Sequence, residues 1–261
     1  MKVSRREALG VIAGGVGATV VLGMRGADAV AAIEKRPPPV LTEKGTLKHQ
    51  PLPYEPLDPA YVGNLTYEAF YHGHCMYSVV EGLVRALSEK VGGPYLTWPT
   101  AALDYGFAGV NGWGSICGTL NGAAYALNLI SPDPRPLIDE LYVWFEQTSL
   151  PNFVPEGPKF EIDGAVSNSI LCHVSIIAWT RESGLGAFTP ERKDRCGQLA
   201  ASVAVKVTEL LNAQAAGEFV PAFPISEETQ ECRGCHTQKA SYLENSQSKM
   251  NCFACHEKHP L

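Results

Sequence analysis

The segment ICGTLNGAAYALNLI, residues 116–130, places apolar side chains at every third or fourth position. This spacing is the period of one face of an α-helix. The same period begins at Cys75 and again at Cys196, whereas runs that alternate apolar and polar residues are scarce. We therefore predict an all-α fold, with helices near residues 74–90, 115–130, 135–149, 166–181 and 190–213.

Two of these helices have recognisable starts, and a third has an unusual composition. Asp133-Pro134 and Thr189-Pro190 each place a capping residue before a proline, which is favourable at the first helical position. The stretch from Ile170 to Trp179 is almost wholly apolar. We expect it to form a central helix that is buried on most sides.

Two short motifs lie at the C-terminal end, CRGCH at residues 232–236 and CFACH at residues 252–256. A C-x-x-C-H motif is typical of covalent haem c attachment, with two thioether bonds and a histidine ligand to the iron. One zinc ion held by all four cysteines is the alternative, but a zinc ribbon does not explain the two histidines. We predict two haem c groups, with these thioether cysteines and proximal histidines: Cys232, Cys235 and His236; Cys252, Cys255 and His256.

The N-terminus has the features of an export signal. Arg5 and Arg6 precede an apolar, glycine-rich run, and Ala27-Asp28-Ala29 forms a cleavage site. We predict a twin-arginine signal over residues 1–29 and a periplasmic protein that begins near Val30. The apolar run of about fourteen residues is shorter than a membrane-spanning helix requires, so we expect no membrane span after cleavage. An uncleaved N-terminal anchor is the alternative.

Four further cysteines are spread through the helical part: Cys75, Cys117, Cys172 and Cys196. They are 42, 55 and 24 residues apart, so only tertiary folding could bring them together. Each lies on or beside the inward face of an expected helix, which suits an iron–sulfur cluster. The twin-arginine route carries folded proteins and therefore also favours a second cofactor. Two disulfides or free thiols are the alternatives in an oxidising compartment.

The order of these cysteines, together with the segment GSICGTLNGA at residues 114–123, resembles the redox-active family named for its C…GCAxxG…C…C pattern. With two haem motifs appended, residues 45–261 resemble the split-Soret cytochrome c family. Gly118 stands at the position of the pattern's alanine and keeps that residue small. The resemblance implies a periplasmic homodimer, with two bis-histidine haems close together near the dimer interface and an iron–sulfur centre in each subunit.

The chain divides into four parts: the signal 1–29, a proline-rich extended arm 30–62, a helical iron–sulfur domain with its connector 63–228, and a small irregular dihaem segment 229–261. The arm is too rich in proline for a helix, and a flexible linker is the alternative to an ordered arm. The last part is too short to enclose two haems. The helical body or a second subunit must cover them, which independently favours a homodimer.

The sixth ligand of each haem iron is not fixed by the motifs. His259 could reach the neighbouring haem or one in a partner subunit, and His49 on the arm could reach across an interface. We take these two as the candidate distal ligands. Other side chains are weaker candidates, and the three histidines among them adjoin cysteines of the expected cluster: His72, His74, His173, Met76 and Met250.

Composition and motifs together favour an electron carrier. The 261-residue chain is 45% hydrophobic, enough for one substantial domain with a small appendage. Its formal charge is −6, and removal of the signal, which carries a net +2, makes it −8. An acidic chain argues against nucleic acid and favours basic redox partners. The alternatives are a multi-metal oxidoreductase with an open haem or cluster position and a structural or haem-handling scaffold.

Overall fold

The structure is a computed structural model that describes residues 50–237 and 246–257. The expected signal, most of the proline-rich arm and both candidate distal ligands, His49 and His259, lie outside these residues. The described residues belong to one compact unit. None of the described helices is long and apolar enough to cross a membrane.

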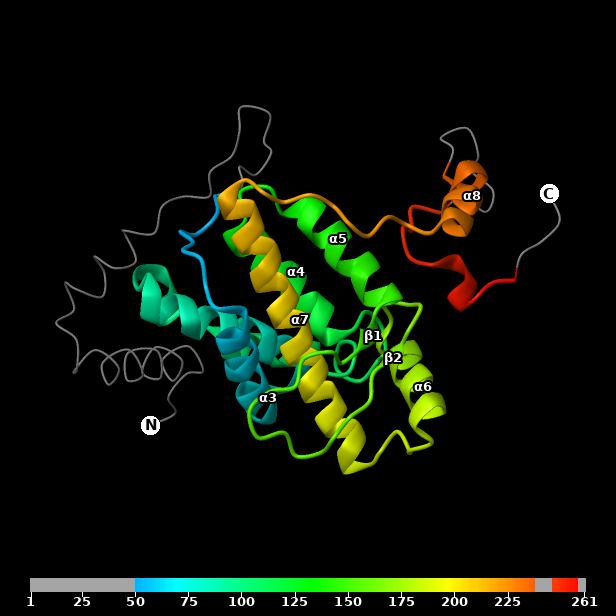
Figure 1. The fold of residues 1–261 in the computed structure, drawn as a ribbon, viewed down its shortest axis with the longest axis horizontal. Helices are drawn as coiled ribbons and strands as arrows, with labels where there is room; N and C mark the ends of the chain where they lie inside the picture. Colours follow the sequence, from blue (N-terminus) through cyan, green and yellow to red (C-terminus); the bar gives the residue numbers. More distant parts are fainter. Residues whose placement is uncertain (1–49, 238–245, 258–261) are drawn as a thin grey trace, which may run out of the picture. The chain divides into compact units, whose positions relative to one another are not determined.

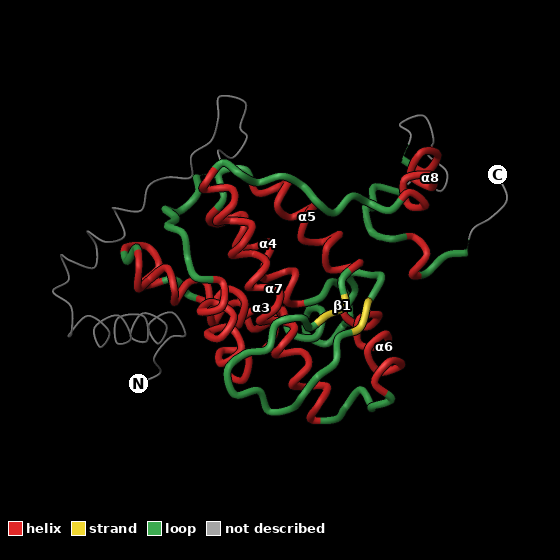
Figure 2. The backbone as a smooth tube through the Cα atoms, in the orientation of Figure 1, coloured by secondary structure: helices red, strands yellow, loops and turns green. Residues whose placement is uncertain are grey.

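Four helices build the body of this unit. They are α3 (Pro59–Lys90), α4 (Gly118–Ile130), α5 (Pro134–Gln147) and α7 (Pro190–Ala216). The two long helices α3 and α7 share the most extensive contact, and α4 packs against α3, α5 and α7. Figures 1 and 2 show this arrangement, with almost all of the regular structure helical. The predicted all-α class is therefore confirmed.

The core lies where the apolar faces of these helices meet. Leu83 on α3, Leu127 on α4, Leu141 on α5 and Val203 on α7 have no exposed surface. Burial of one such side chain contributes about 1.5–3 kcal/mol to the free energy of unfolding. In α4, the apolar residues whose spacing predicted the helix are therefore the ones that it buries.

The start of α3 corrects the predicted end of the arm. Pro59 is the first residue of the helix, and the Asp58 carboxylate accepts a hydrogen bond from the Ala60 N–H at 3.0 Å. A proline fits this position because the first helical N–H has no partner within the helix. Residues 59–62 are consequently helical and not extended. At α5 and α7 the expected prolines also occupy the first turn, but only Thr189 caps with its side chain.

The described end of the arm, residues 50–58, contains no helix and is fastened to the body. The Asn212 side chain on α7 accepts hydrogen bonds from the Tyr54 hydroxyl at 2.7 Å and from the Leu57 N–H at 3.1 Å. Its amide group donates to the Leu57 carbonyl at 2.8 Å. The Leu52 N–H donates to the Leu129 carbonyl at 2.8 Å. One polar side chain on α7 thus holds the segment that precedes α3.

The expected central helix is shorter and more exposed than predicted. α6 begins at Cys172 and ends at Ser183, and only Cys172, Ser175 and Trp179 are buried. Residues 165–166 form the strand β2 (Ala165–Val166), which pairs antiparallel with β1 (Ser149–Leu150). The Ser167 hydroxyl accepts from the Ser169 N–H at 3.4 Å. Such local side-chain bonds favour turns over helix, so the helix cannot begin at residue 166.

The remaining elements are short. Two 3₁₀ helices, η2 (Gly93–Thr97) and η3 (Thr100–Gly106), follow α3 and pack against it. The C-terminal segment contains α8 (Glu227–His236) and the 3₁₀ helix η4 (Cys252–Ala254), which contact each other. The first C-x-x-C-H motif therefore lies on a helix, and this segment is less irregular than predicted.

Candidate metal centres

The four dispersed cysteines of the helical part meet in the interior. Cys117 is the residue before α4 and Cys172 is the first residue of α6, and an isolated antiparallel bridge between Ile116 and Leu171 joins the segments that contain them. The Cys117 N–H donates to the Ile170 carbonyl at 2.9 Å, and the Cys172 N–H donates to the Ser115 carbonyl at 2.7 Å. Main-chain hydrogen bonds thus bring these two cysteines together although they are 55 residues apart.

Cys75 lies immediately after a break in α3. Gly73 and His74 have non-helical backbone angles, and His74 has a positive φ of 60°. The start of α4 packs closely on this region, because a Cβ atom built on Gly118 would lie 2.7 Å from the Cys75 Cβ atom. It would also lie 2.4 Å from the Gly106 carbonyl oxygen. Only glycine allows α4 to approach Cys75 at this distance.

Cys196 lies on α7 and completes the group. All four thiols are buried and free of disulfides. Burial raises the pKa of Cys75, and the negative charges that Cys196, Cys117 and Cys172 would carry raise it further. Burial raises the pKa of Cys172 to about 12, and Cys117 and Cys196 again contribute. The four thiols therefore lie within electrostatic reach of one another, and burial disfavours the ionisation of Cys75, Cys117 and Cys172 without a positive partner.

The donor set can be compared with what different metals require. Within residues 50–237 and 246–257, no three histidine, cysteine, aspartate or glutamate side chains are placed to hold a single metal ion. A polynuclear cluster spreads its thiolate ligands farther apart than a single ion does, and soft thiolates are the ligands that such clusters use. Four buried thiols in one group form a donor set of the kind that a thiolate-bound iron–sulfur cluster uses.

A buried cation next to these cysteines was not predicted from the sequence. Arg195 is 1% exposed, and its Nη2 atom donates to the Ser175 Oγ atom at 2.9 Å. Its positive charge lowers the pKa of Cys117 and Cys172, although burial outweighs this effect. In the sequence, Arg195 belongs to the charged run ERKDR at residues 191–195, which suggests a solvated face. The one available signal is its position four residues before the core residue Leu199.

The two C-x-x-C-H motifs lie next to each other in the C-terminal segment. The second cysteine of each motif, Cys235 and Cys255, is exposed, whereas Cys232 and Cys252 are half-buried. Burial raises the pKa of Cys252, and the neighbouring Cys232 thiol raises it further. The first cysteines of the two motifs are thus direct neighbours.

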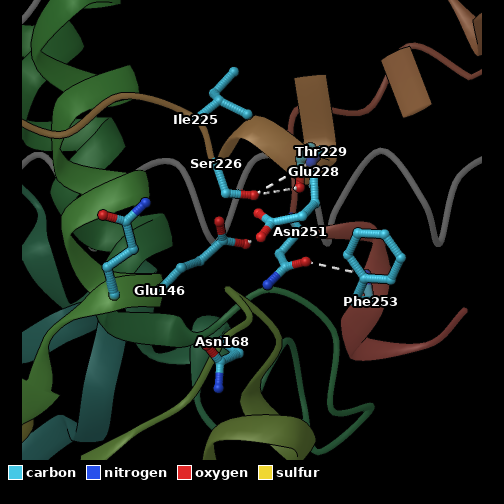
Figure 3. A pocket seen from close by; sticks show the side chains of 9 residues that line it. Glu146, Asn168, Ile225, Ser226, Glu228, Thr229, Asn251 and Phe253 are labelled. Carbon is cyan, nitrogen blue, oxygen red and sulfur yellow. Dashed lines mark hydrogen bonds between the residues drawn. The ribbon is translucent and has the colours of Figure 1, made fainter. Parts of the chain in front are cut away.

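Contacts with the helical body anchor this segment. The Glu146 carboxylate at the end of α5 accepts a hydrogen bond from the Asn251 N–H at 3.1 Å, and Lys249 forms an ion pair with Asp139 at 2.6 Å. Figure 3 shows the cavity between Glu146, Thr229 and Phe253, with Glu146 directed toward Asn251. Burial raises the pKa of Glu146 to about 7. A polar cavity therefore adjoins the second motif.

The weaker distal-ligand candidates lie elsewhere. His72, His74 and His173 are exposed; His74 Nδ1 lies 3.5 Å from the Asp104 carboxylate, and His173 Nδ1 lies 2.8 Å from the Gly114 carbonyl oxygen. Met76 is 2% exposed. It fills the space beside Gly106 and Gly122. The Met250 sulfur accepts from the Ser169 hydroxyl at 3.7 Å. His74 and His173, which directly neighbour Cys75 and Cys172 in the chain, therefore remain beside the cysteine group, whereas Met76 is part of the core.

Comparison with known proteins agrees with these sites. Residues 75–210 match the family of redox-active proteins described by the pattern C_GCAxxG_C_C, and this range contains all four interior cysteines. Where the pattern has Gly-Cys-Ala, this chain has Ile116-Cys117-Gly118. The close packing at Gly118 explains why the third residue of this triplet is no larger than glycine here.

Similarity to a curated protein and to a solved structure extends over most of the chain. The split-Soret cytochrome c of Desulfovibrio desulfuricans is 30% identical over 268 residues, which covers 98% of this chain and 95% of that protein. A solved structure of split-Soret cytochrome c from the same species, reported for its novel iron centre, has a TM-score of 0.73 and 31% identity. That alignment covers 80% of this chain and 90% of the solved chain. This chain therefore belongs to the split-Soret cytochrome c family, and its helical part belongs to the C_GCAxxG_C_C redox-active family.

Proposed function

We propose that this protein is a periplasmic electron carrier that holds two haems c in its C-terminal segment and an iron–sulfur cluster among its four interior cysteines. The observation that carries the proposal is the meeting of four widely separated cysteines in the core, beside a C-terminal segment in which two haem-attachment motifs are neighbours. When bound, haem and cluster would supply one-electron chemistry. The polypeptide would fix distances and tune potentials.

The haem sites follow the two motifs. Cys232 and Cys235 would form the thioether bonds to the first haem, and Cys252 and Cys255 would form those to the second. His236 and His256 would be the proximal ligands. The contact between α8 and η4 supports haems that are near neighbours, so that electrons would pass readily between them. As distal ligands we propose His49 and His259, with a homodimer in which one subunit supplies ligands to the other.

The cluster site follows the interior cysteines. We propose Cys75, Cys117, Cys172 and Cys196 as ligands of a [2Fe-2S] or [4Fe-4S] cluster. Burial of all four thiols excludes water from the site, and the raised pKa values of Cys75, Cys117 and Cys172 mean that these three need a positive partner to ionise. Iron would supply that charge. A solved relative reported for a novel iron centre supports a metal in addition to haem.

Export and partner choice follow from the sequence. The twin-arginine signal at residues 1–29 would deliver a folded, cluster-containing protein to the periplasm, where haem c is attached. The acidic charge of the chain, −6 in full, favours positively charged redox partners. Their association should weaken as salt is added, because salt screens exposed charges.

The decisive experiment is an iron count on anaerobically purified protein. Iron in excess of two atoms per chain, with a cluster signal in electron paramagnetic resonance, supports the proposal. In Cys172→Ser this signal should disappear while the haem absorption remains. Val203→Ala is the matched control, because it removes buried volume from α7 without removing a donor. If the unaltered protein contains only haem iron and its interior cysteines are paired as disulfides, the proposal of a cluster is wrong.

The same samples separate an electron carrier from an oxidoreductase. If each of the two haem irons has six ligands, neither iron has a position for a small molecule. Carbon monoxide should then not change the visible spectrum of the reduced protein. A haem that binds carbon monoxide and turns over a small substrate would contradict electron transfer as the main function and would support an enzyme.

A further inference from the structure

The buried guanidinium of Arg195 lacks a counter-charge in the described structure. Its side chain is 1% exposed, and its Nε atom has no hydrogen-bond partner among residues 50–237 and 246–257. An arginine cannot shed its proton inside a protein. A buried charge is costly unless it is paired and hydrogen-bonded. The fold therefore maintains a positive charge here that needs a negative partner.

No carboxylate in this part of the chain meets that need. The ion pairs among the described residues involve other cations, and none of them includes Arg195. The neighbouring carboxylate, Asp194, accepts hydrogen bonds from the hydroxyls of Tyr67 and Tyr71, from the Gln198 amide and from the Phe160 N–H. Both carboxylate oxygens of Asp194 are thus engaged by groups other than Arg195.

The position of the guanidinium points to the cysteine group. Arg195 directly precedes Cys196 on α7, and it donates to Ser175, which follows Cys172 by three residues on α6. Residues three apart on a helix share a face. The cation therefore spans the gap between the two helices that carry these cysteines.

We propose that Arg195 is the buried counter-charge of the thiolate-bound cluster and that it sets the reduction potential of that cluster. This inference rests on the proposed function, because it requires a cluster on the four interior cysteines. Neutral thiols offer the guanidinium no charge, whereas iron-bound thiolates do. Reduction adds one electron and one unit of negative charge to the cluster. A fixed buried cation favours that reduced state and raises the potential, so Arg195 is a positioning residue and not a ligand.

The test is a redox titration of the anaerobic holoprotein with dithionite, in which electron paramagnetic resonance follows the cluster and absorption follows the haems. In Arg195→Gln the cluster midpoint should fall by at least about 59 mV, a tenfold change in a one-electron equilibrium, while the haem midpoints stay in place. Arg195→Lys keeps the charge, so the cluster midpoint should fall less in this variant than in Arg195→Gln. Arg181→Gln is the matched control, because it removes an exposed charge from α6.

A second measurement compares thermal unfolding with and without the cluster. In cluster-free protein, Arg195→Met should raise Tm, because it removes an unpaired buried charge at similar length. In cluster-loaded protein the same substitution should lower Tm, because the cluster loses its counter-charge. Arg181→Gln should change neither value. The Tm change caused by Arg195→Met should have opposite signs in cluster-free and cluster-loaded protein only if the charge of Arg195 acts on the cluster.

Three outcomes overturn the inference. One is an unchanged cluster midpoint in Arg195→Gln. Another is loss of the cluster from both Arg195→Gln and Arg195→Lys with helix content preserved, because lysine keeps the charge. The third is a Tm change of the same sign in both states. Absence of the cluster from the unaltered protein is a different result, since it would remove the proposed function before any substitution is made.

Discussion

Replacement of Gly118 by alanine tests how tightly α4 is packed against Cys75. The substitution restores the residue that the family pattern has at this position, yet the structure predicts that it is harmful. The added Cβ atom would lie 2.4 Å from the Gly106 carbonyl oxygen and 2.7 Å from the Cys75 Cβ atom. Neither neighbour is the flexible end of a side chain, so the backbone of α4 or η3 must move.

The magnitude follows from two opposed effects. Overpacking of a tight core costs about 1–3 kcal/mol. Alanine in place of glycine returns at most about 1 kcal/mol through helix propensity and the entropy of the unfolded chain. We expect Gly118→Ala to lower the free energy of unfolding by about 1–2 kcal/mol. This loss corresponds to a fall in Tm of roughly 2–8 °C for a chain of this size.

The assay is urea unfolding followed by circular dichroism, together with the non-haem iron content. The matched control is Gly186→Ala, where φ is not positive and the new Cβ atom would meet only the Thr189 Cγ2 atom, at 3.4 Å. That variant should be as stable as the unaltered protein or slightly more stable. If Gly118→Ala unfolds at the same urea concentration as this control and retains its iron, the packing argument at Cys75 is wrong.

Two further substitutions test the anchors of the arm and of the C-terminal segment. Asn212→Ala removes the acceptor of the Tyr54 hydroxyl and the Leu57 N–H, which should cost about 1–3 kcal/mol and speed proteolysis before Asp58; an unchanged cleavage rate would show that this side chain does not hold the arm. Burial raises the Glu146 pKa from 4.5 to about 7. The folded state then binds this proton more tightly, so its contribution to stability is present at low pH and is lost as the pH rises from 4.5 to about 7. Glu146→Gln should flatten that dependence in urea unfolding between pH 4 and 8, and an equally steep slope in the variant would contradict the assignment.

The helices that the sequence predicts best are those with a clear apolar period. α4 and α7 lie close to their expected ranges, because apolar residues recur at helical spacing along both segments. The start of α3 was missed because proline density was taken to exclude a helix, although Pro59 occupies the one position where a helix favours proline. For α6, apolar composition without a clear period indicated burial, whereas Ile177 is 43% exposed.

The candidate site was only partly predictable for a similar reason. The two C-x-x-C-H motifs are local, so their spacing alone makes them visible in the sequence. Convergence of the interior cysteines depends on a long-range bridge between Ile116 and Leu171, which no local pattern specifies. Arg195 could not be distinguished from the charged residues that precede it in the sequence, because burial of a charge is decided by the helix that packs over it. The convergence of the cysteines and the burial of Arg195 therefore depend on tertiary contacts, which sequence periodicity does not reveal.

Two of the interior cysteines lie where helices begin, Cys117 immediately before α4 and Cys172 at the first position of α6. The N-terminal end of a helix carries about half a positive elementary charge, which originates in the aligned peptide dipoles. These dipoles are part of the backbone and are shielded from the surrounding electrolyte in the interior. The midpoint of a centre at this place should consequently vary little between dilute and concentrated salt, whereas the rate of electron exchange with a charged partner should fall steeply.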